Sequence, residues 1–143
     1  MKKFSFRLER VRAFRKLQME QEKAKLEACF TRLREIEAAA AELDRQVAAA
    51  SGAVRQPGSG GEHRPYESYR AHAGITRRSL AAQRAQALAA IATQQSNVLA
   101  ARQRFEMLDK FRDRAKARWK AETDKEQEEL AAELYLARRQ LLN

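Results

Sequence analysis

The chain has 143 residues, of which 44% are apolar, 7% aromatic and 34% charged, and its formal net charge is +10. Because alanine dominates the apolar residues and charges are dense, the composition is typical of long helices or coiled coils and excludes a large compact core. The net charge predicts a basic surface, which can meet nucleic acid, anionic lipid or an acidic protein face.

The first predicted element is a helix over about residues 4–50, where apolar residues recur at positions a and d of a heptad repeat. Position a holds Met19, Leu26, Leu33, Ala40 and Val47, and position d holds Cys29, Ile36, Leu43 and Ala50. Phe4, Leu8 and Val11 keep this rhythm in another phase. We therefore expect a phase shift near residues 14–19, with a different buried stripe at the start of the helix.

Helix breakers gather at one place, because four of the five glycines and both prolines lie between residues 52 and 65. They predict a flexible bend over about residues 51–65, with Gly52 ending the first helix and Pro65 in the first turn of the second. A connection of this length lets the chain reverse and bury both apolar stripes, so we predict one antiparallel hairpin domain. A bundle of several copies would bury the same stripes and remains an alternative.

The second predicted helix spans about residues 66–142, with Gly74 as a weak point. One heptad position holds Ile91, Val98, Phe105 and Trp119, interrupted by Arg112, and the other holds Leu80, Ala87, Ala101, Leu108 and Ala115, interrupted by Gln94. After Trp119 the register slips, and a new stripe follows at Leu130, Leu134, Ala137 and Leu141.

The two predicted helices differ in length. With the bend centred near Gly58, the first helix begins opposite residues 110–116, and the rest of the second helix projects alone over roughly 40 Å. Apolar side chains on such an overhang mark a docking surface. The predicted fold class is all-α: a long antiparallel two-helix coiled-coil hairpin with a C-terminal helix overhang.

The sequence predicts no enzyme, no cofactor and no metal site. "PGSGG" lacks the Lys-Ser/Thr and the preceding strand of a phosphate loop. Two histidines and the lone Cys29 form no metal-binding set, and Cys29 is interpreted as a small core residue. No stretch has the apolar length of a signal-peptide core or a membrane span, so we expect a cytoplasmic protein.

The two ends of the chain resemble those of the FliJ family. "FSFRLERVRAFRKLQMEQEKAKLEA" is similar to the family's Phe-x-Phe-x-Leu-Glu opening and the basic helix that follows it. "LDKFRDRAKARWKAETDKEQEELAAELYLAR" is similar to its closing segment, although Ala131 and Ala132 stand where the family has Asp-Glu. The resemblance implies a soluble, antiparallel coiled-coil component and chaperone of flagellar type III protein export, peripheral to the inner face of the cell membrane.

The resemblance also implies partners and contact residues. Family members insert their paired termini into the hexameric flagellar export ATPase, contact an export-gate membrane protein and interact with export chaperones. Carried over by position, with Trp119 added from its place on the predicted overhang, the ATPase-facing set is Phe4, Phe6, Leu8, Glu9, Arg12, Arg15, Trp119, Glu126, Gln127 and Leu130. The gate-facing set, near the bend, is Leu43, Tyr66 and Tyr69.

Two readings from other classes remain open. The pI of 10.3 and the basic stretch "RLERVRAFRK" are compatible with a nucleic-acid-binding rod, although no recognised binding motif occurs and nucleic acid is not the expected partner. The heptads alone are also compatible with a structural homodimer.

Overall fold

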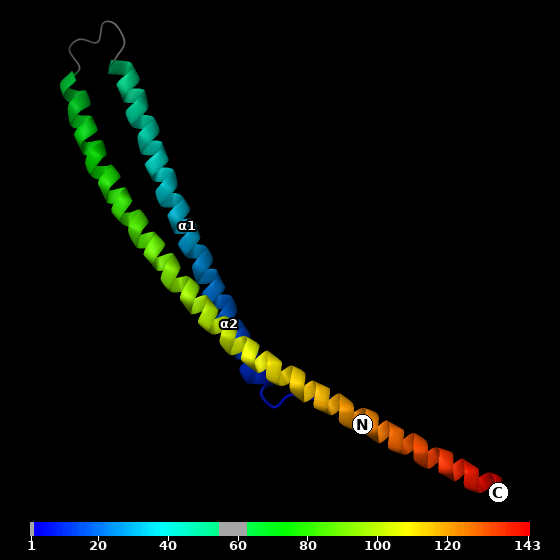
Figure 1. Cartoon of the computed structure of the whole chain (residues 1–143). Coiled ribbons are helices and arrows are strands. Elements are labelled where there is room, and N and C mark those ends of the chain that lie inside the picture. Colours follow the sequence, from blue (N-terminus) through cyan, green and yellow to red (C-terminus); the bar gives the residue numbers. More distant parts are fainter. Residues whose placement is uncertain (1, 55–62) are drawn as a thin grey trace. The chain divides into compact units, whose positions relative to one another are not determined.

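The computed structural model of the chain describes residues 2–54 and 63–143 and contains two α-helices (Figure 1). Helix α1 spans Glu9–Val54 and helix α2 spans His63–Leu142. The two helices pack against each other, and the described residues contain no strand. The predicted all-α helical hairpin is therefore confirmed.

The helix boundaries correct the prediction at three points. Residues 2–6 are not helical, and α1 begins at Glu9 instead of residue 4. Leu8 caps α1, because its carbonyl oxygen accepts a hydrogen bond from the Arg12 N–H at 2.8 Å. Helix α1 also continues past Gly52 to Val54, and α2 starts before Pro65, which occupies its first turn. The predicted bend over residues 51–65 is thus too wide, and residues 55–62 lie outside the described part of the chain.

Gly74 does not interrupt α2. The helix is continuous through this position, and a Cβ atom built there would meet nothing within 4 Å. A single glycine costs a helix interior about 1 kcal/mol relative to alanine, which the packing of neighbouring turns offsets.

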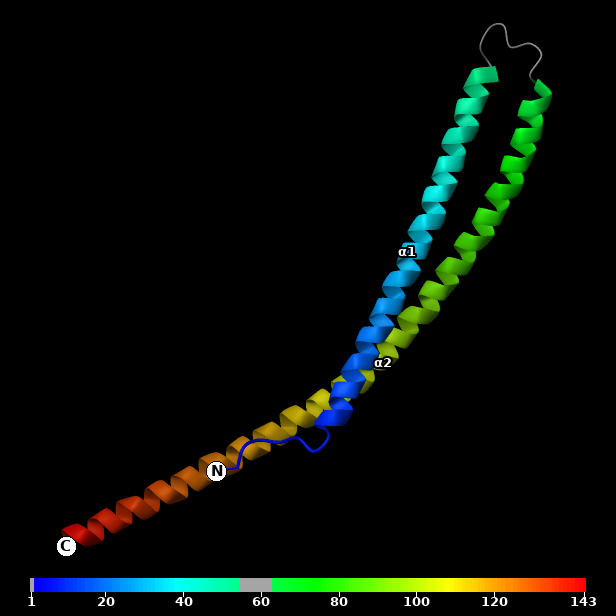
Figure 2. The same cartoon turned by 180° about the vertical axis from the view of Figure 1, so that it is seen from behind.

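The chain forms two compact units, and each contains parts of both helices. Unit 1 consists of Met1–Glu20 and Ala100–Asn143, and unit 2 of Gln21–Leu99. The reverse view in Figure 2 shows unit 1's N-terminal segment alongside the orange part of α2.

The core of unit 2 is the predicted a/d seam, meaning the heptad positions a and d of both helices. Its buried apolar residues are Ile36, Ala73, Ala87, Ile91 and Val98. The remaining predicted seam residues of α1 in this unit, such as Leu33 and Leu43, are half-buried. The heptad prediction is confirmed here, with small alanines allowing close approach of the helices.

Ion pairs across the seam of unit 2 show that its helices run antiparallel. Arg84 lies 3.4 Å from Glu37, and Arg77 lies 2.7 Å from Asp44. The later residue of α1 therefore pairs with the earlier residue of α2, as in an antiparallel pair. All four side chains are about half exposed, and such pairs contribute little to stability. The ion pairs show which residues of the two helices lie opposite each other, and the burial of the apolar seam supplies most of the stability.

Unit 2 also buries one polar layer in its seam. Gln94 is 9% exposed, and its amide donates hydrogen bonds to the backbone carbonyl oxygen of Glu22, at 3.0 Å, and to the Glu22 carboxylate. Asn97 donates to the Gln94 side-chain oxygen at 3.2 Å, so both ends of the buried amide are satisfied. The hydrogen bonds from Gln94 and Lys25 lower the pKa of Glu22, the Gln94 bond being the larger cause.

In unit 1 the heptad register continues without the predicted phase shift. Arg12 and Arg15, one heptad before Met19 and Glu22, are half-buried, whereas Val11 is 43% exposed. The expectation of a separate stripe through Phe4, Leu8 and Val11 is therefore wrong. Arginines can occupy these seam positions because their stems pack along the partner helix while their guanidinium groups reach polar partners, the carboxylates of Glu9 and Asp109 for Arg12 and the side-chain oxygen of Gln18 for Arg15.

Candidate functional site

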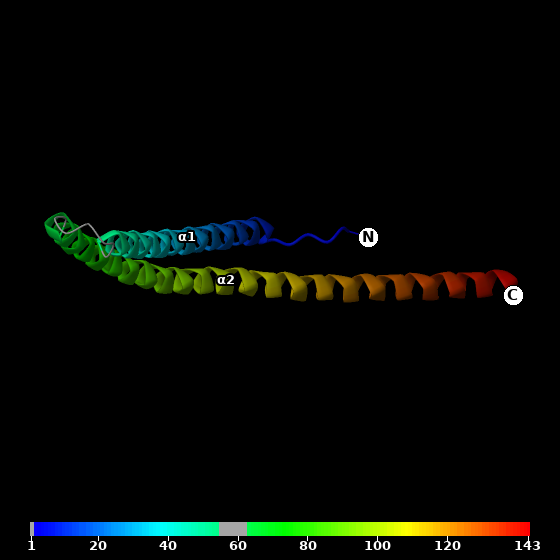
Figure 3. The ribbon, with the colours of Figure 1, turned by 90° about the horizontal axis from the view of Figure 1, so that it is seen from above.

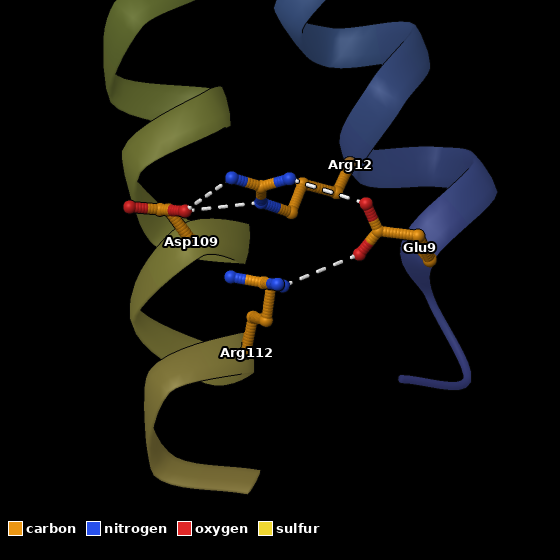
Figure 4. Close-up of polar contacts among 4 residues, drawn as sticks. All are labelled: Glu9, Arg12, Asp109 and Arg112. Atoms are coloured by element: carbon orange, nitrogen blue, oxygen red, sulfur yellow. Dashed lines mark hydrogen bonds and ion pairs between the residues drawn. The ribbon is translucent and has the colours of Figure 1, made fainter. Parts of the chain in front are cut away.

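The beginning of α1 is fastened to α2 by a cluster of four charged side chains in unit 1 (Figure 4). Asp109 Oδ1 accepts hydrogen bonds from Arg12 Nη2 at 2.7 Å and from Arg12 Nε at 3.0 Å. Glu9 lies between the two arginines, 3.2 Å from Arg12 Nη1 and 3.5 Å from Arg112 Nε. Two cations and two anions thus alternate across the seam, so each charge has an opposite neighbour.

Arg12 is the centre of this cluster. Its side chain is only 19% exposed, and its guanidinium carbon lies 5.2 Å from the centroid of the Phe105 ring. The hydrogen bonds to Asp109 are the largest cause that raises the pKa of Arg12, and the charge of Glu9 acts in the same direction. The arginine is therefore a permanent cation held by carboxylates and an aromatic face, a structural tie between the helices.

The N-terminal segment before α1 is held on α2 by Trp119. The indole Nε1–H of Trp119 donates to the backbone carbonyl oxygen of Lys2 at 2.9 Å. The Phe4 and Trp119 rings are 5.9 Å apart between centroids, with an interplanar angle of 56°. Lys2, Trp119, Glu122, Thr123 and Glu126 line an open hollow of about 410 Å³ beside this contact. The last covered turns of α2 lie here.

Beyond Thr123 every residue of the chain is exposed. In Figure 3 this part of α2, drawn in orange to red, continues past the N-terminal segment with no other part of unit 1 beside it. Leu130, Leu134, Leu136, Leu141 and Leu142 are between 55% and 88% exposed. We call residues 124–142 the uncovered segment. Its bare leucines, which the overhang prediction placed here, are a candidate docking surface.

Leu130, Leu134, Ala137 and Leu141 share one side of the uncovered segment, because helical residues four and seven apart lie on one face. Glu122, Glu126, Glu129 and Glu133 follow the same spacing and lie along one edge of that stripe. The surface therefore offers a partner an apolar stripe with an acidic margin. A complementary partner would present apolar side chains beside cations.

The structure brings the two halves of the predicted ATPase-facing set together in unit 1. Phe4 meets Trp119, while Glu9 and Arg12 are engaged in the charged cluster. Arg15 donates to the side-chain oxygen of Gln18 at 3.0 Å, and Phe6 and Leu8 are half-buried. Glu126, Gln127 and Leu130 lie at the start of the uncovered segment or beside the hollow. Several members thus serve contacts within the chain.

The predicted gate-facing residues lie in unit 2. Leu43 is half-buried in the seam, and Tyr66 and Tyr69 are half-buried in the first turns of α2. Tyr66 lines an open hollow of about 420 Å³ together with Val47, Arg70 and Arg77. The Arg77–Asp44 ion pair forms part of its wall.

The apolar pattern does not reveal the polar residues that join the two helices within each unit. Asp109 carries no signal in this pattern, and Arg112 in unit 1 and Gln94 in unit 2 only interrupt the heptads. In the structure each interruption makes a specific polar contact, Arg112 with Glu9 and Gln94 with Glu22. A polar residue at a heptad position was the available signal, since such residues specify register in coiled coils.

Two further findings bear on the class of site. Over residues 2–54 and 63–143, no group of three or more His, Cys, Asp or Glu side chains could hold a metal ion. Neither helix, in its described part, has a stretch long and apolar enough to cross a membrane.

Comparisons with protein-family models, curated proteins and solved structures return no match for this chain.

Proposed function

We propose that this chain is a non-catalytic stalk, adaptor and general chaperone of flagellar type III protein export. Its paired termini, the N-terminal segment and the uncovered segment of unit 1, would dock into the hexameric export ATPase. The Leu43, Tyr66 and Tyr69 region of unit 2 would contact a membrane export-gate protein. The chain would work in the cytoplasm at the inner face of the cell membrane, where it also meets export chaperones. The resemblance of the two ends of the chain to the FliJ family suggests these partners.

One observation carries the proposal. The N-terminal segment is fastened to α2 at Trp119, and directly beyond it α2 leaves a segment with bare leucines. The apolar side of this helical segment is not covered by its own chain. Burying it against a partner protein lowers the free energy, because apolar surface is removed from water. A ring of subunits suits such a segment because it can cover the leucines and the acidic margin at the same time.

The proposal is tested by a pull-down with the cognate export ATPase. Deleting residues 120–143 should abolish both binding and stimulation of the ATPase, and helical content by circular dichroism should show that the rest remains folded. A finer variant combines Leu130→Asp with Leu134→Asp. Its matched control combines Ile75→Asp with Leu99→Asp, two residues of unit 2 that are 59% and 54% exposed. Undiminished binding by the deletion variant rules out the uncovered segment as the docking surface.

The gate contact needs its own experiment. Tyr66→Ala with Tyr69→Ala should weaken binding to the cytoplasmic part of the export-gate protein and leave ATPase binding unchanged. Equal loss of both bindings would indicate a general loss of structure, which circular dichroism would detect.

The two alternative functions make different predictions. A nucleic-acid-binding rod predicts tight, steeply salt-dependent binding in a retardation assay at physiological salt. A structural homodimer predicts a doubled mass in light scattering with no other partner. The stalk predicts neither result.

A further inference from the structure

One flank of unit 1 combines exposed apolar side chains with cations. Val11, Phe14 and Leu17 of α1 and Met107 and Phe111 of α2 are 43–54% exposed. Around them stand five exposed cations, Arg10, Arg104, Lys110, Arg114 and Arg118. We call these ten residues the basic apolar face. At 100° per residue, the members on each helix fall within an arc of about 120°.

The charged cluster shows that both halves of this face lie on the same flank. In α2, Phe105 and Arg112 are at position a and Leu108 at position d, so Asp109 is at position e, as Glu9 is in α1. Glu9 meets Arg112 and Asp109 meets Arg12, both on one side of the seam. Position g therefore lies on the opposite flank in both helices, and it holds Val11 in α1 and Phe111 in α2. Arg12 lies opposite Asp109, and the two helices run antiparallel. Phe14, two residues further along α1, therefore lies close to the level of Met107, two residues earlier in α2.

Carboxylates are few on the basic apolar face. Between residues 103 and 118, Asp109 and Asp113 lie about 160° from Phe111 around the helix axis, whereas Glu106 lies at the edge of the face. It lines a hollow of about 350 Å³ together with Met107, Lys110, Phe111 and Arg114. Among the described residues, none of the five cations of the face forms an ion pair. By contrast, the seam cations Arg12 and Arg112 are both paired with carboxylates. With five cations and only Glu106 at its edge, the face carries a positive net charge.

We propose that the basic apolar face binds the surface of an anionic phospholipid bilayer. Arg10 and Lys110 lie at the outer edges of the face on different helices, and a planar anionic surface can reach both edges at once. A single partner helix, about 10–12 Å across, would fill the groove between α1 and α2 and leave the outer cations without partners.

The apolar members distinguish a bilayer from a nucleic acid. Phosphate groups of DNA or RNA would meet the cations but would leave Phe14, Met107 and Phe111 in water. In a bilayer interface, cations reach the headgroups while aromatic and aliphatic side chains enter the acyl boundary. The face requires no membrane-spanning segment. It would add direct lipid contact to the partner-mediated membrane association of the proposed function, and it uses residues outside the uncovered segment.

Flotation of the full-length protein with lipid vesicles tests this proposal. Vesicles of phosphatidylcholine with about a third phosphatidylglycerol should carry the protein upward at about 0.1 M salt, and pure phosphatidylcholine vesicles should not. At about 1 M salt the bound fraction should fall strongly, because the Debye length shrinks to roughly 3 Å.

A pair of charge-reversal variants locates the binding to the face. Lys110→Glu with Arg114→Glu should lower the partition coefficient by at least about tenfold, since each cation near an anionic surface contributes substantially. The matched control, Arg102→Glu with Lys116→Glu, changes the net charge equally on the opposite side of α2. It should alter the partition coefficient by less than about threefold, since those cations lie further from the bilayer.

Three results would overturn the proposal. The first is no flotation of the unaltered protein with anionic vesicles, and the second is an equal effect of the two charge-reversal pairs. The third is retardation of DNA at physiological salt, lost in Lys110→Glu with Arg114→Glu, without vesicle binding. None of these assays contains the export ATPase, so their failure is distinguishable from failure of the stalk proposal.

Discussion

The indole of Trp119 donates its N–H to the backbone carbonyl oxygen of Lys2, across 117 positions of the sequence, at 2.9 Å. This bond and the ring contact with Phe4 hold residues 2–6 against α2 without any helical hydrogen bonds of their own. The N-terminal end of the chain is thereby fixed next to the base of the uncovered segment.

The first prediction concerns this contact. Trp119 is the chain's only tryptophan, so its fluorescence reports on the N-terminal segment directly. Phe4→Ala should shift the emission maximum to longer wavelength, because the indole becomes more exposed to water, and should cost about 1 kcal/mol of stability. Phe14→Ala removes a ring that is 54% exposed, whereas the ring contact of Trp119 is with Phe4, so this control should leave the emission unchanged. An unaltered spectrum in Phe4→Ala would contradict the contact.

The second prediction concerns pH and the polar layer of unit 2. The pKa of Glu22 is lowered in the folded chain by the Gln94 and Lys25 hydrogen bonds, so its ionised form favours folding. This stabilisation is present above the ordinary glutamate pKa of 4.5 and is lost as pH falls through the lower folded value. Glu22→Gln should therefore lower Tm more at about pH 7 than at about pH 3.

Differential scanning calorimetry of the two proteins at both pH values measures the difference. Glu20→Gln, on an exposed residue close by in α1, is the control and should give the same Tm difference at both values. A Tm difference for Glu22→Gln that does not depend on pH would refute the role assigned to its carboxylate.

The third prediction tests the register of the apolar seam. Leu33→Asp places a carboxylate at a half-buried position a, and should lower the free energy of unfolding by about 2 kcal/mol. Ala38→Asp adds the same charge at an exposed position of α1 and should change it by less than about 0.5 kcal/mol. Urea denaturation followed by circular dichroism compares the two. Similar losses in both variants would show that Leu33 does not face α2.

The fourth prediction concerns the glycine inside α2. Gly74→Ala should stabilise the protein by roughly 0.5–1 kcal/mol, because alanine loses less backbone entropy in a helix and the new methyl group meets no atom within 4 Å. Gly52→Ala lies in the last turn of α1, where fraying reduces the gain. Thermal denaturation should show a higher Tm for Gly74→Ala. A lower Tm would mean that α2 needs the glycine for a bend.

The heptad pattern predicted the seam of unit 2 well because apolar burial sets most of its layers, the Gln94 layer excepted. Residues such as Ile36 and Val98 had to be covered, and only one side of each helix collected them. The same reasoning failed at the start of α1, where it sought an apolar stripe and placed Val11 in the seam. Arg12 holds that position instead, because Asp109, Glu9 and the Phe105 ring together satisfy a half-buried guanidinium. Apolar periodicity does not count such a residue.

The sequence by itself determined the two helices and the bare leucines after Trp119, since these follow from local periodicity and from the unequal lengths of the apolar stripes. It predicted the antiparallel pairing, but a bundle of several copies would satisfy the same pattern. Only the tertiary structure decided where α1 begins, which carboxylates hold Arg12, and that Val11 and Phe111 share a flank with unpaired cations. These features depend on residues far apart in the chain meeting at one level of two packed helices. The local sequence pattern around one residue does not show which residue of the other helix it contacts. A charged residue such as Arg12 or Asp109, taken alone, is equally compatible with an exposed position on a helix.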